Sequence, residues 1–178
     1  MKKSAGIILY RRNAAQVEVL LAHPGGPFWA NKDDASWSIP KGEFEDESPL
    51  DAAIREFEEE TGIVLKGDFL ELTPVKQPSG KVVFAWACEG DCDPSTVASN
   101  TFSMEWPKGS GVMKDFPEID RVAWFPQGAA RRKILKGQIP IIVQLEKVLG
   151  VPPAECDPEQ ESVPAVNSKL EGQQLSFL

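Results

Sequence analysis

Two apolar runs at the start of the chain set the pattern for a sheet. Residues 4–12 ("SAGIILYRR") and 17–24 ("VEVLLAHP") are rich in β-branched residues and leucine and are separated by the polar "NAAQ", which predicts two paired strands. Further strands are predicted at residues 69–77, 81–90 and 121–126. The run at 81–90 is nearly all apolar, so we expect it to lie centrally in the sheet.

The strongest helical signal lies between Ser48 and Gly62. Ser48 is a good N-cap, Pro49 suits the first helical position, and Gly62 is a typical C-terminal stop. A helical turn at 126–135 and an amphipathic helix at 139–149 complete the predicted elements. Apolar side chains recur along the first helix at the spacing of one buried stripe; they are Leu50, Ala53, Ile54 and Phe57.

A long loop separates the second predicted strand from this helix. Residues 24–42 contain many glycine, proline and aromatic residues and cannot form a regular element over most of their length. Loops of this length in compact domains are often functional. Only "SWSIP", residues 36–40, is predicted as a strand within the loop.

The composition changes after Gly150. Residues 151–178 are rich in Pro, Glu, Gln and Ser and hold five acidic residues against one lysine, which is typical of disorder. We therefore predict one domain at residues 1–150, followed by an acidic tail at residues 151–178. The tail supplies half of the net charge of −8, so the domain itself is only mildly acidic.

Charge and cysteine content exclude several classes of function. A net charge of −8 argues against binding to duplex nucleic acid or to an anionic membrane. No apolar run approaches the roughly 20 residues that span a bilayer. The three cysteines are an odd number in no familiar zinc spacing, which favours reduced thiols. Together these observations predict a soluble, cytoplasmic protein.

Four glutamates crowd the second half of the first predicted helix, at positions 56, 58, 59 and 60. Like charges at helical neighbour spacing repel one another. At about 100° per residue, Glu56, Glu59 and Glu60 share one arc beside the apolar stripe, whereas Glu58 points elsewhere. Divalent cations remove such repulsion, and Mg²⁺ commonly binds carboxylates together with substrate phosphates. The cluster therefore predicts a metal site for a phosphate-bearing substrate, with a solvated acidic helix face as the alternative.

The residues around this cluster resemble the Nudix box, whose pattern is Gly, five residues, Glu, seven residues, then Arg-Glu-apolar-x-Glu-Glu-x-Gly-apolar. "GEFEDESPLDAAIREFEEETGI", residues 42–63, departs from it once, because four residues rather than five separate Gly42 from Glu47. From Glu47 onward the spacing is intact, and the resemblance extends over roughly residues 3–149. The matched residues are Gly42, Glu47, Arg55, Glu56, Phe57, Glu59, Glu60, Gly62 and Ile63.

This resemblance implies a fold, a cofactor and a set of site residues. The fold would be α/β, a Nudix α/β/α sandwich with a mixed β-sheet between helices, and the cofactor would be Mg²⁺, for which Mn²⁺ substitutes. Arg55 would hold the carboxylates in place, and Glu47 would be an auxiliary ligand or a support. A backbone carbonyl at Lys41 or Gly42 would complete the metal shell. The metal ligands carried over by position are Glu56, Glu59 and Glu60.

The reaction that the resemblance implies is hydrolysis of a diphosphate linkage. Water attacks phosphorus while metal ions neutralise the developing charge and lower the pKa of the bound water. A general base accepts the proton. In the family this base is a glutamate of the box or one from a later loop, and the candidates in the later loop are Glu105 and Glu118, of which we select Glu118.

Residues outside the helix bear on the substrate. "SIPKG", residues 38–42, resembles a Pro-Lys-Gly sequence of Nudix enzymes that act on dinucleoside polyphosphates and of RNA-decapping relatives, so Lys41 is a candidate contact to a distal phosphate. Trp29 and Trp37 are candidates for stacking on a base, with packing onto the core as the alternative. His23, the only histidine, is interpreted as structural.

Two classes of function follow. The first is a Nudix pyrophosphohydrolase acting on a dinucleoside polyphosphate or a nucleoside triphosphate, as a monomer or as a homodimer of the kind frequent in the family. The second is a Nudix module that senses a nucleotide without hydrolysing it, against which the complete set of metal ligands argues. The final residues Gln174 to Leu178, "QLSFL", resemble peptides by which bacterial replication and repair proteins dock on the DNA sliding clamp, and would tether such a module.

Overall fold

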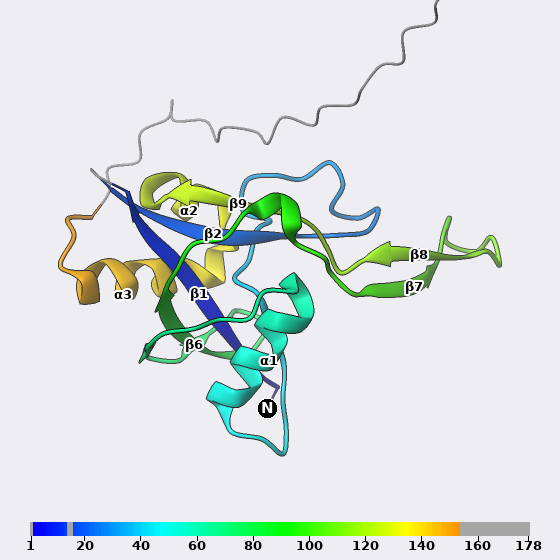
Figure 1. The fold of residues 1–178 in the computed structure, drawn as a ribbon. Helices are drawn as coiled ribbons and strands as arrows, with labels where there is room; N and C mark the ends of the chain where they lie inside the picture. The colour runs from blue at the N-terminus through cyan, green and yellow to red at the C-terminus, as the bar shows by residue number, and fades with distance from the viewer. Residues whose placement is uncertain (1, 14–15, 154–178) are drawn as a thin grey trace, which may run out of the picture.

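A mixed β-sheet lies at the centre of the molecule, with helices on both of its faces (Figure 1). The structure is a computed structural model and describes residues 2–13 and 16–153. The strand order is β4-β6-β1-β2-β9, in which β1 and β6 are parallel and the remaining pairs are antiparallel. These strands are β1 (Lys3–Asn13), β2 (Gln16–Pro24), β4 (Phe69–Glu71), β6 (Val82–Glu89) and β9 (Ile119–Pro126).

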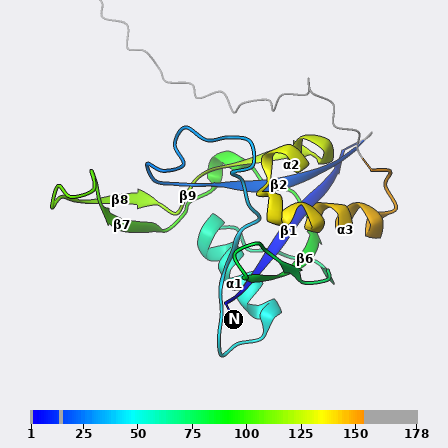
Figure 2. The same cartoon turned by 180° about the vertical axis from the view of Figure 1, so that it is seen from behind.

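Two hydrophobic cores sandwich the sheet. Helix α1 (Pro49–Thr61) covers one face, and helices α2 (Gln127–Lys133) and α3 (Ile139–Leu149) cover the other (Figures 1 and 2). Neighbouring residues of β1 enter opposite cores, with Ile7 on the α1 side and Ile8 on the α2 and α3 side, and both are fully buried. The predicted layers are therefore present, and β6 lies inside the sheet because β1 pairs with one of its edges and β4 with the other.

Both ends of α1 are fixed as the sequence predicts. The Ser48 hydroxyl accepts a hydrogen bond of 3.1 Å from the backbone N–H of Asp51, which satisfies one of the free donors at the helix start. Gly62 adopts a left-handed conformation with φ of 72° and donates 2.7 Å to the Glu58 carbonyl. The helix is therefore held in length and register, which fixes the direction of its glutamates.

The segment between the long loop and α1 differs from the prediction. Residues 36–40 form only isolated bridges, Ala22 to Ser38 and Trp37 to Ile134, whereas the strand is β3 (Lys41–Glu43). β3 pairs with the first residues of β1, on the same edge that β2 uses further along. The prediction was wrong by a few residues because this pairing depends on a distant strand and not on local propensity.

A two-stranded hairpin between β6 and β9 has no counterpart in the prediction. Strands β7 (Thr101–Glu105) and β8 (Met113–Pro117) pair with each other in a sheet of their own and project from the body (Figure 1). None of their residues is buried, and the apolar residues of β7, Phe102 and Met104, form an alternation too short to predict a strand from sequence.

The remaining elements follow the prediction closely. The run at residues 69–77 divides into β4 and a short β5 (Val75–Lys76), which pairs with β6. Two 3₁₀ turns, Pro94–Thr96 and Lys136–Gln138, complete the described elements. Among the described helices none has the length and apolar character needed to cross a membrane. Most of the predicted tail, from residue 154 onward, lies outside the described residues.

Replacing Ser48 with alanine tests the cap that fixes α1. We expect Ser48→Ala to lower the free energy of unfolding by about 1 kcal/mol, because the Asp51 N–H loses its partner. Urea denaturation followed by circular dichroism measures this difference. The matched control is Ser79→Ala, which removes an exposed hydroxyl from a turn. Equal stability of the two variants would show that the cap does not stabilise the helix.

Candidate active site

Two glutamates of α1 lie directly against the backbone of β3. The backbone N–H of Lys41 donates a hydrogen bond of 2.9 Å to Oε2 of Glu60. A Cβ at Gly42 would lie 1.9 Å from the carboxylate carbon of Glu56, so this approach requires a glycine. The backbone at Lys41 and Gly42 and the carboxylates of Glu56 and Glu60 therefore form one contiguous polar surface.

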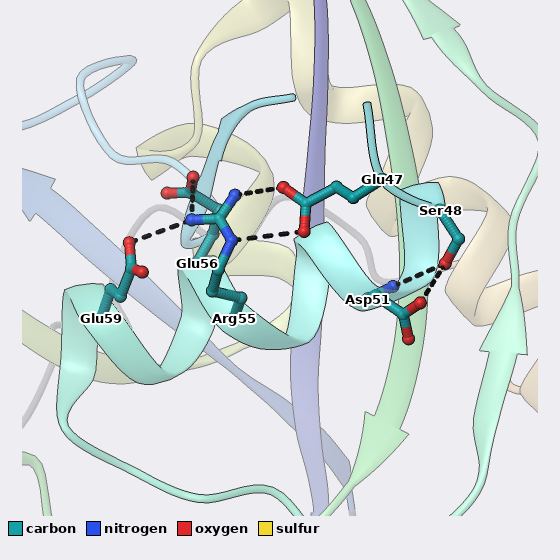
Figure 3. A network of polar contacts seen from close by, with 6 residues as sticks. All are labelled: Glu47, Ser48, Asp51, Arg55, Glu56 and Glu59. Atoms are coloured by element: carbon teal, nitrogen blue, oxygen red, sulfur yellow. Dashed lines mark hydrogen bonds and ion pairs between the residues drawn. The ribbon is translucent and has the colours of Figure 1, made fainter. Parts of the chain in front are cut away.

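Arg55 lies at the centre of a network of carboxylates (Figure 3). Its Nη2 lies 2.6 Å from Oε1 of Glu47, and its Nε lies 3.3 Å from the second oxygen of the same carboxylate. Its Nη1 donates to Glu56 at 2.8 Å and to Glu59 at 3.0 Å. Hydrogen bonding to Glu47 is the largest influence on this guanidinium and raises the pKa of Arg55. The permanent charge of Arg55 thus offsets much of the repulsion among the three carboxylates.

These contacts distinguish the two roles left open for Glu47. Both of its carboxylate oxygens face the guanidinium of Arg55, in the forked geometry typical of arginine and carboxylate pairs. With one residue fewer between Gly42 and Glu47 than in the Nudix box, the loop still brings Glu47 to Arg55. This geometry favours Glu47 as a support of Arg55.

Burial makes the charged forms of two site glutamates costly. Burial raises the pKa of Glu60 to about 7. The charge of Lys41 and the hydrogen bond from its backbone N–H oppose this shift, whereas the charges of Glu56 and Glu118 add to it. Burial likewise raises the pKa of Glu56, against the effect of Arg55 and with that of Glu118. Two partly buried carboxylates of like charge therefore face the same polar surface.

Electrostatic effects and hydrogen bonds distinguish the two candidate bases, Glu105 and Glu118. The charge of Glu118 raises the pKa of both Glu56 and Glu60, so Glu118 lies within electrostatic range of these carboxylates of α1. The carboxylate of Glu105 instead accepts a hydrogen bond of 2.6 Å from the Gly111 N–H within the projecting hairpin. Glu118 therefore influences the charges of the site, whereas Glu105 belongs to the hairpin.

The donor set suits a hard divalent cation. Its side-chain donors are carboxylate oxygens, which Mg²⁺ prefers, and a cation would stabilise the charged forms that burial disfavours. Among residues 2–13 and 16–153, no three carboxylate, histidine or cysteine side chains are grouped closely enough to hold a metal ion. Glu59 is turned toward Arg55 and its side chain is 47% exposed. Joint binding by Glu56, Glu59 and Glu60 therefore requires a rearrangement of side chains.

The residues predicted to contact substrate occupy different surroundings. Trp37 is 4% exposed, its ring packs edge-on against His23 and Phe125, and its indole N–H donates to Asp33. A buried ring has no face for a base, so the alternative of core packing holds for Trp37. Trp29 is partly exposed and carries the Lys32 ammonium 4.5 Å from its ring centroid.

Lys41 is a partly buried residue beside Glu60 and not a solvated lysine of a turn. Burial is the largest influence and lowers the pKa of Lys41, while the charge of Glu60 opposes this effect. Sequence reasoning missed Lys81, whose Nζ lies 2.8 Å from Glu43 and whose charge also lowers the pKa of Lys41. No local signal marks Lys81, because it reaches Glu43 only through the pairing of β3 and β6 with opposite edges of β1.

Comparisons with known proteins relate this chain to one family and one fold. The family model described as NUDIX domain matches residues 1–145. The comparison with curated proteins gives no match. Among solved structures, the NUDIX domain of Shewanella oneidensis NrtR complexed with ADP ribose is 17% identical with a TM-score of 0.57, covering 83% of this chain and 87% of that chain.

Two further structures share the fold. A Caenorhabditis elegans Ap4A hydrolase binary complex is 22% identical with a TM-score of 0.57, covering 84% of this chain and 98% of that chain. The C-terminal domain of mouse MUTYH, in complex with human PCNA, is 12% identical with a TM-score of 0.55, covering 87% of this chain and 94% of that chain. At these identities the likeness shows the fold alone, and it confirms the predicted Nudix α/β/α sandwich.

Glu60 makes the stability of the metal-free protein depend on pH. Its pKa is about 7 in the folded protein against an ordinary value of 4.5, so the folded state binds more protons than the unfolded state between these values. The stability that the protonated carboxyl contributes is fully present below the ordinary value and is lost as the pH rises through about 7. Urea denaturation in EDTA, from about pH 5 to about pH 8, should show this decline.

Two comparisons isolate the contribution of Glu60. Glu60→Gln should remove most of the decline, because glutamine does not titrate. Saturating Mg²⁺ should also flatten it in the wild-type protein, because a bound cation stabilises the charged carboxylate. A decline of the same size in Glu60→Gln would assign the pH dependence to another group.

Proposed function

The chain belongs to the Nudix domain family, and from this we propose that it is a divalent-metal-dependent pyrophosphohydrolase that cleaves the diphosphate linkage of a nucleoside diphosphate derivative. One observation carries the proposal, namely the Arg55 network that gathers three carboxylates beside the β3 backbone. A protein that only reads a nucleotide has no need to keep mutually repelling carboxylates next to one another.

Each residue of the site has a role in this proposal. Glu56, Glu59 and Glu60, with the backbone carbonyl of Gly42, would hold Mg²⁺ or Mn²⁺. The bound ion would supply Lewis-acid stabilisation of the phosphate charge and a more acidic water. Arg55 orients the glutamates through the hydrogen bonds described above.

The bonds that change in the reaction are few. Glu118 accepts a proton from water as the water oxygen forms a bond to one phosphorus of the diphosphate. The bond between that phosphorus and the bridging oxygen breaks, and the bridging oxygen keeps the electron pair and leaves as part of the second phosphate product. Lys41 offers a positive charge beside Glu60 for a neighbouring phosphate group.

The proposed substrates are a dinucleoside polyphosphate or a nucleoside triphosphate. Lys41 lies at the position of the Pro-Lys-Gly sequence, and its charge sits next to the carboxylates rather than in open solvent. Trp29 and the 57% exposed Phe28 remain available on the long loop for contact with a base. The Ap4A hydrolase named above shares this fold, which makes diadenosine polyphosphates the first compounds to test.

Several expectations stay proposals. These are a domain at residues 1–150 with an acidic tail, a cytoplasmic location, homodimer formation and a lack of affinity for duplex nucleic acid. The predicted sliding-clamp peptide, Gln174 to Leu178, lies outside the described residues, and the MUTYH domain that shares this fold is itself in complex with PCNA.

A substrate panel tests the proposed function. It contains nucleoside triphosphates, diadenosine polyphosphates, nucleotide sugars, ADP-ribose, and capped or triphosphorylated RNA, each with Mg²⁺ or Mn²⁺. We expect metal-dependent phosphate or nucleotide release from at least one diadenosine polyphosphate or nucleoside triphosphate. Tight binding of a nucleotide without turnover of any compound would instead support the sensing module.

Glu59→Gln separates the metal site from the fold. The substitution should abolish turnover by removing a metal ligand. It should leave the melting temperature nearly unchanged, because Glu59 is half exposed and, among the described residues, is bonded only to Arg55. Initial rates and thermal melts of the purified variant measure both effects. Glu58→Gln, the same change on an exposed position of the same helix, is the control and should keep wild-type rates. Wild-type turnover by Glu59→Gln would exclude Glu59 as a metal ligand.

A further inference from the structure

His23 is fully buried where β2 ends and joins two distant segments. Its Nδ1 lies 2.8 Å from Oδ1 of Asp120 in β9, and its Nε2 lies 2.8 Å from the backbone carbonyl of Lys32 in the long loop. The edge of the ring packs against Trp37, with 5.1 Å between the ring centroids. The orientation of the ring is therefore fixed by two hydrogen bonds and an aromatic contact.

The partners of His23 define its hydrogen-bonding state. A carbonyl oxygen only accepts, so Nε2 must donate to Lys32. The second ring nitrogen, Nδ1, lies 2.8 Å from Oδ1 of Asp120, so both nitrogens of the ring are hydrogen-bonded.

Asp120 is the extra residue of a β-bulge. In the pairing of β2 with β9, His23 lies opposite Arg121 and Pro24 lies opposite Ile119, which leaves Asp120 without an opposite residue. Bulges bend a strand and re-aim its side chains, and they are frequent next to active sites. The contact with His23 fixes the side chain of Asp120 inward at this irregular point, two positions after the candidate base.

The backbone of Glu118 is held from both sides. The N–H of Gly25 donates 2.9 Å to the Glu118 carbonyl, and the Glu118 N–H donates 2.8 Å to the carbonyl of Asn100. A Cβ on Gly25 would lie 1.9 Å from the carbonyl oxygen of Pro117, so the end of β2 packs directly onto this segment. The two residues after His23 in β2 and its loop thus reach the backbone that carries Glu118.

Such anchoring matters because Glu118 follows the projecting hairpin. Strands β7 and β8 form a two-stranded sheet apart from the central one (Figure 1), so the hairpin cannot hold Glu118 against α1 through strand pairing. The backbone of the candidate base is held instead by the Gly25 N–H at the end of β2 and by the Asn100 carbonyl before β7. After Glu118, the buried Ile119 side chain packs in the core on the α1 side, and Asp120 at the bulge is tied to the buried His23.

We propose that His23 and Asp120 are positioning residues that hold Glu118 at the catalytic carboxylates through the β-bulge of β9. This inference rests on the proposed function, in which Glu118 is the general base. His23 and Asp120 do not touch the reacting atoms, so they act on the turnover number by orienting Glu118. Substrate binding, which relies on other residues, should change little.

A double-mutant cycle tests whether the pair acts through Glu118. Asp120→Ala should lower kcat by about 10- to 100-fold, the scale of a misplaced catalytic group, with KM within about 2-fold of wild type. In the Glu118→Gln background the same substitution should lower kcat by less than about 3-fold, because no base remains to be misplaced. An equal loss in both backgrounds would overturn the proposal, and so would wild-type kcat in Asp120→Ala.

Two further variants separate positioning from general damage. Asp120→Asn should restore kcat to within about 3-fold of wild type, because the amide N–H can donate to a neutral His23 while Nε2 still donates to Lys32. Asp115→Ala is the control: it makes the same substitution as Asp120→Ala at an exposed position of the hairpin and should leave kcat unchanged. Failure of Asp120→Asn to recover activity while remaining folded would contradict a positioning role for the pair.

Amide exchange tests the same contact without catalysis. In Asp120→Ala the Gly25 N–H, which donates to Glu118, should exchange at least about 10-fold faster, while the Ala22 N–H, bonded to Ser38 in the adjoining part of β2, keeps its rate. Unchanged exchange at Gly25 would overturn the proposal. This readout holds even if the wild-type chain hydrolyses none of the substrate panel, so failure of the proposed function and failure of the inference are distinguishable.

Discussion

One guanidinium, that of Arg55, keeps the carboxylates of Glu47, Glu56 and Glu59 within hydrogen-bonding distance of a common point. Without it, the glutamates of α1 would repel one another and the loop before the helix would lose its main polar contact. Arg55 is partly exposed and belongs to the helix itself, so it can hold the carboxylates without being buried between them. The polar face of α1 therefore has a defined arrangement and is not a mobile acidic surface.

The opposite wall of the site depends on close approach of the backbone. β3 pairs with β1, and this pairing brings Lys41 and Gly42 to the glutamates of α1. The apolar stripe of α1, which includes the fully buried Phe57, holds the helix on the same face of the sheet. The sheet thus fixes both walls of the site, and the cost of burying Glu60 appears in its raised pKa of about 7. A divalent cation would offset this cost.

Local signals explain why α1 could be predicted from sequence. Ser48, Gly62 and the apolar stripe specify the helix within a single segment, and the Nudix box lies on that helix. The limits of β3 could not be predicted, because they depend on which edge of β1 remains open to pairing. The same holds for Trp37, whose burial depends on contact with Phe125 of β9 in the same core. The pairing of His23 with Asp120 joins residues far apart in the chain, so no local pattern marks it.

The choice between two candidate bases shows what the structure adds. Sequence alone offered Glu105 and Glu118 in one loop. The fold makes Glu105 a hairpin residue, whereas the charge of Glu118 acts on Glu56 and Glu60. The position of Glu118 follows from the pairing of β9 with β2. Residues far from the box therefore complete the arrangement that the box begins.

The most direct test is anomalous scattering from crystals grown with Mn²⁺ and a non-hydrolysable diphosphate nucleotide. A metal site on the helix predicts a Mn²⁺ peak bound by the carboxylates of Glu56, Glu59 and Glu60 and the carbonyl of Gly42, with Glu118 facing it. Crystals that contain bound nucleotide but no Mn²⁺ at these glutamates, at a Mn²⁺ concentration that saturates turnover, would contradict the assignment of this face as the metal site.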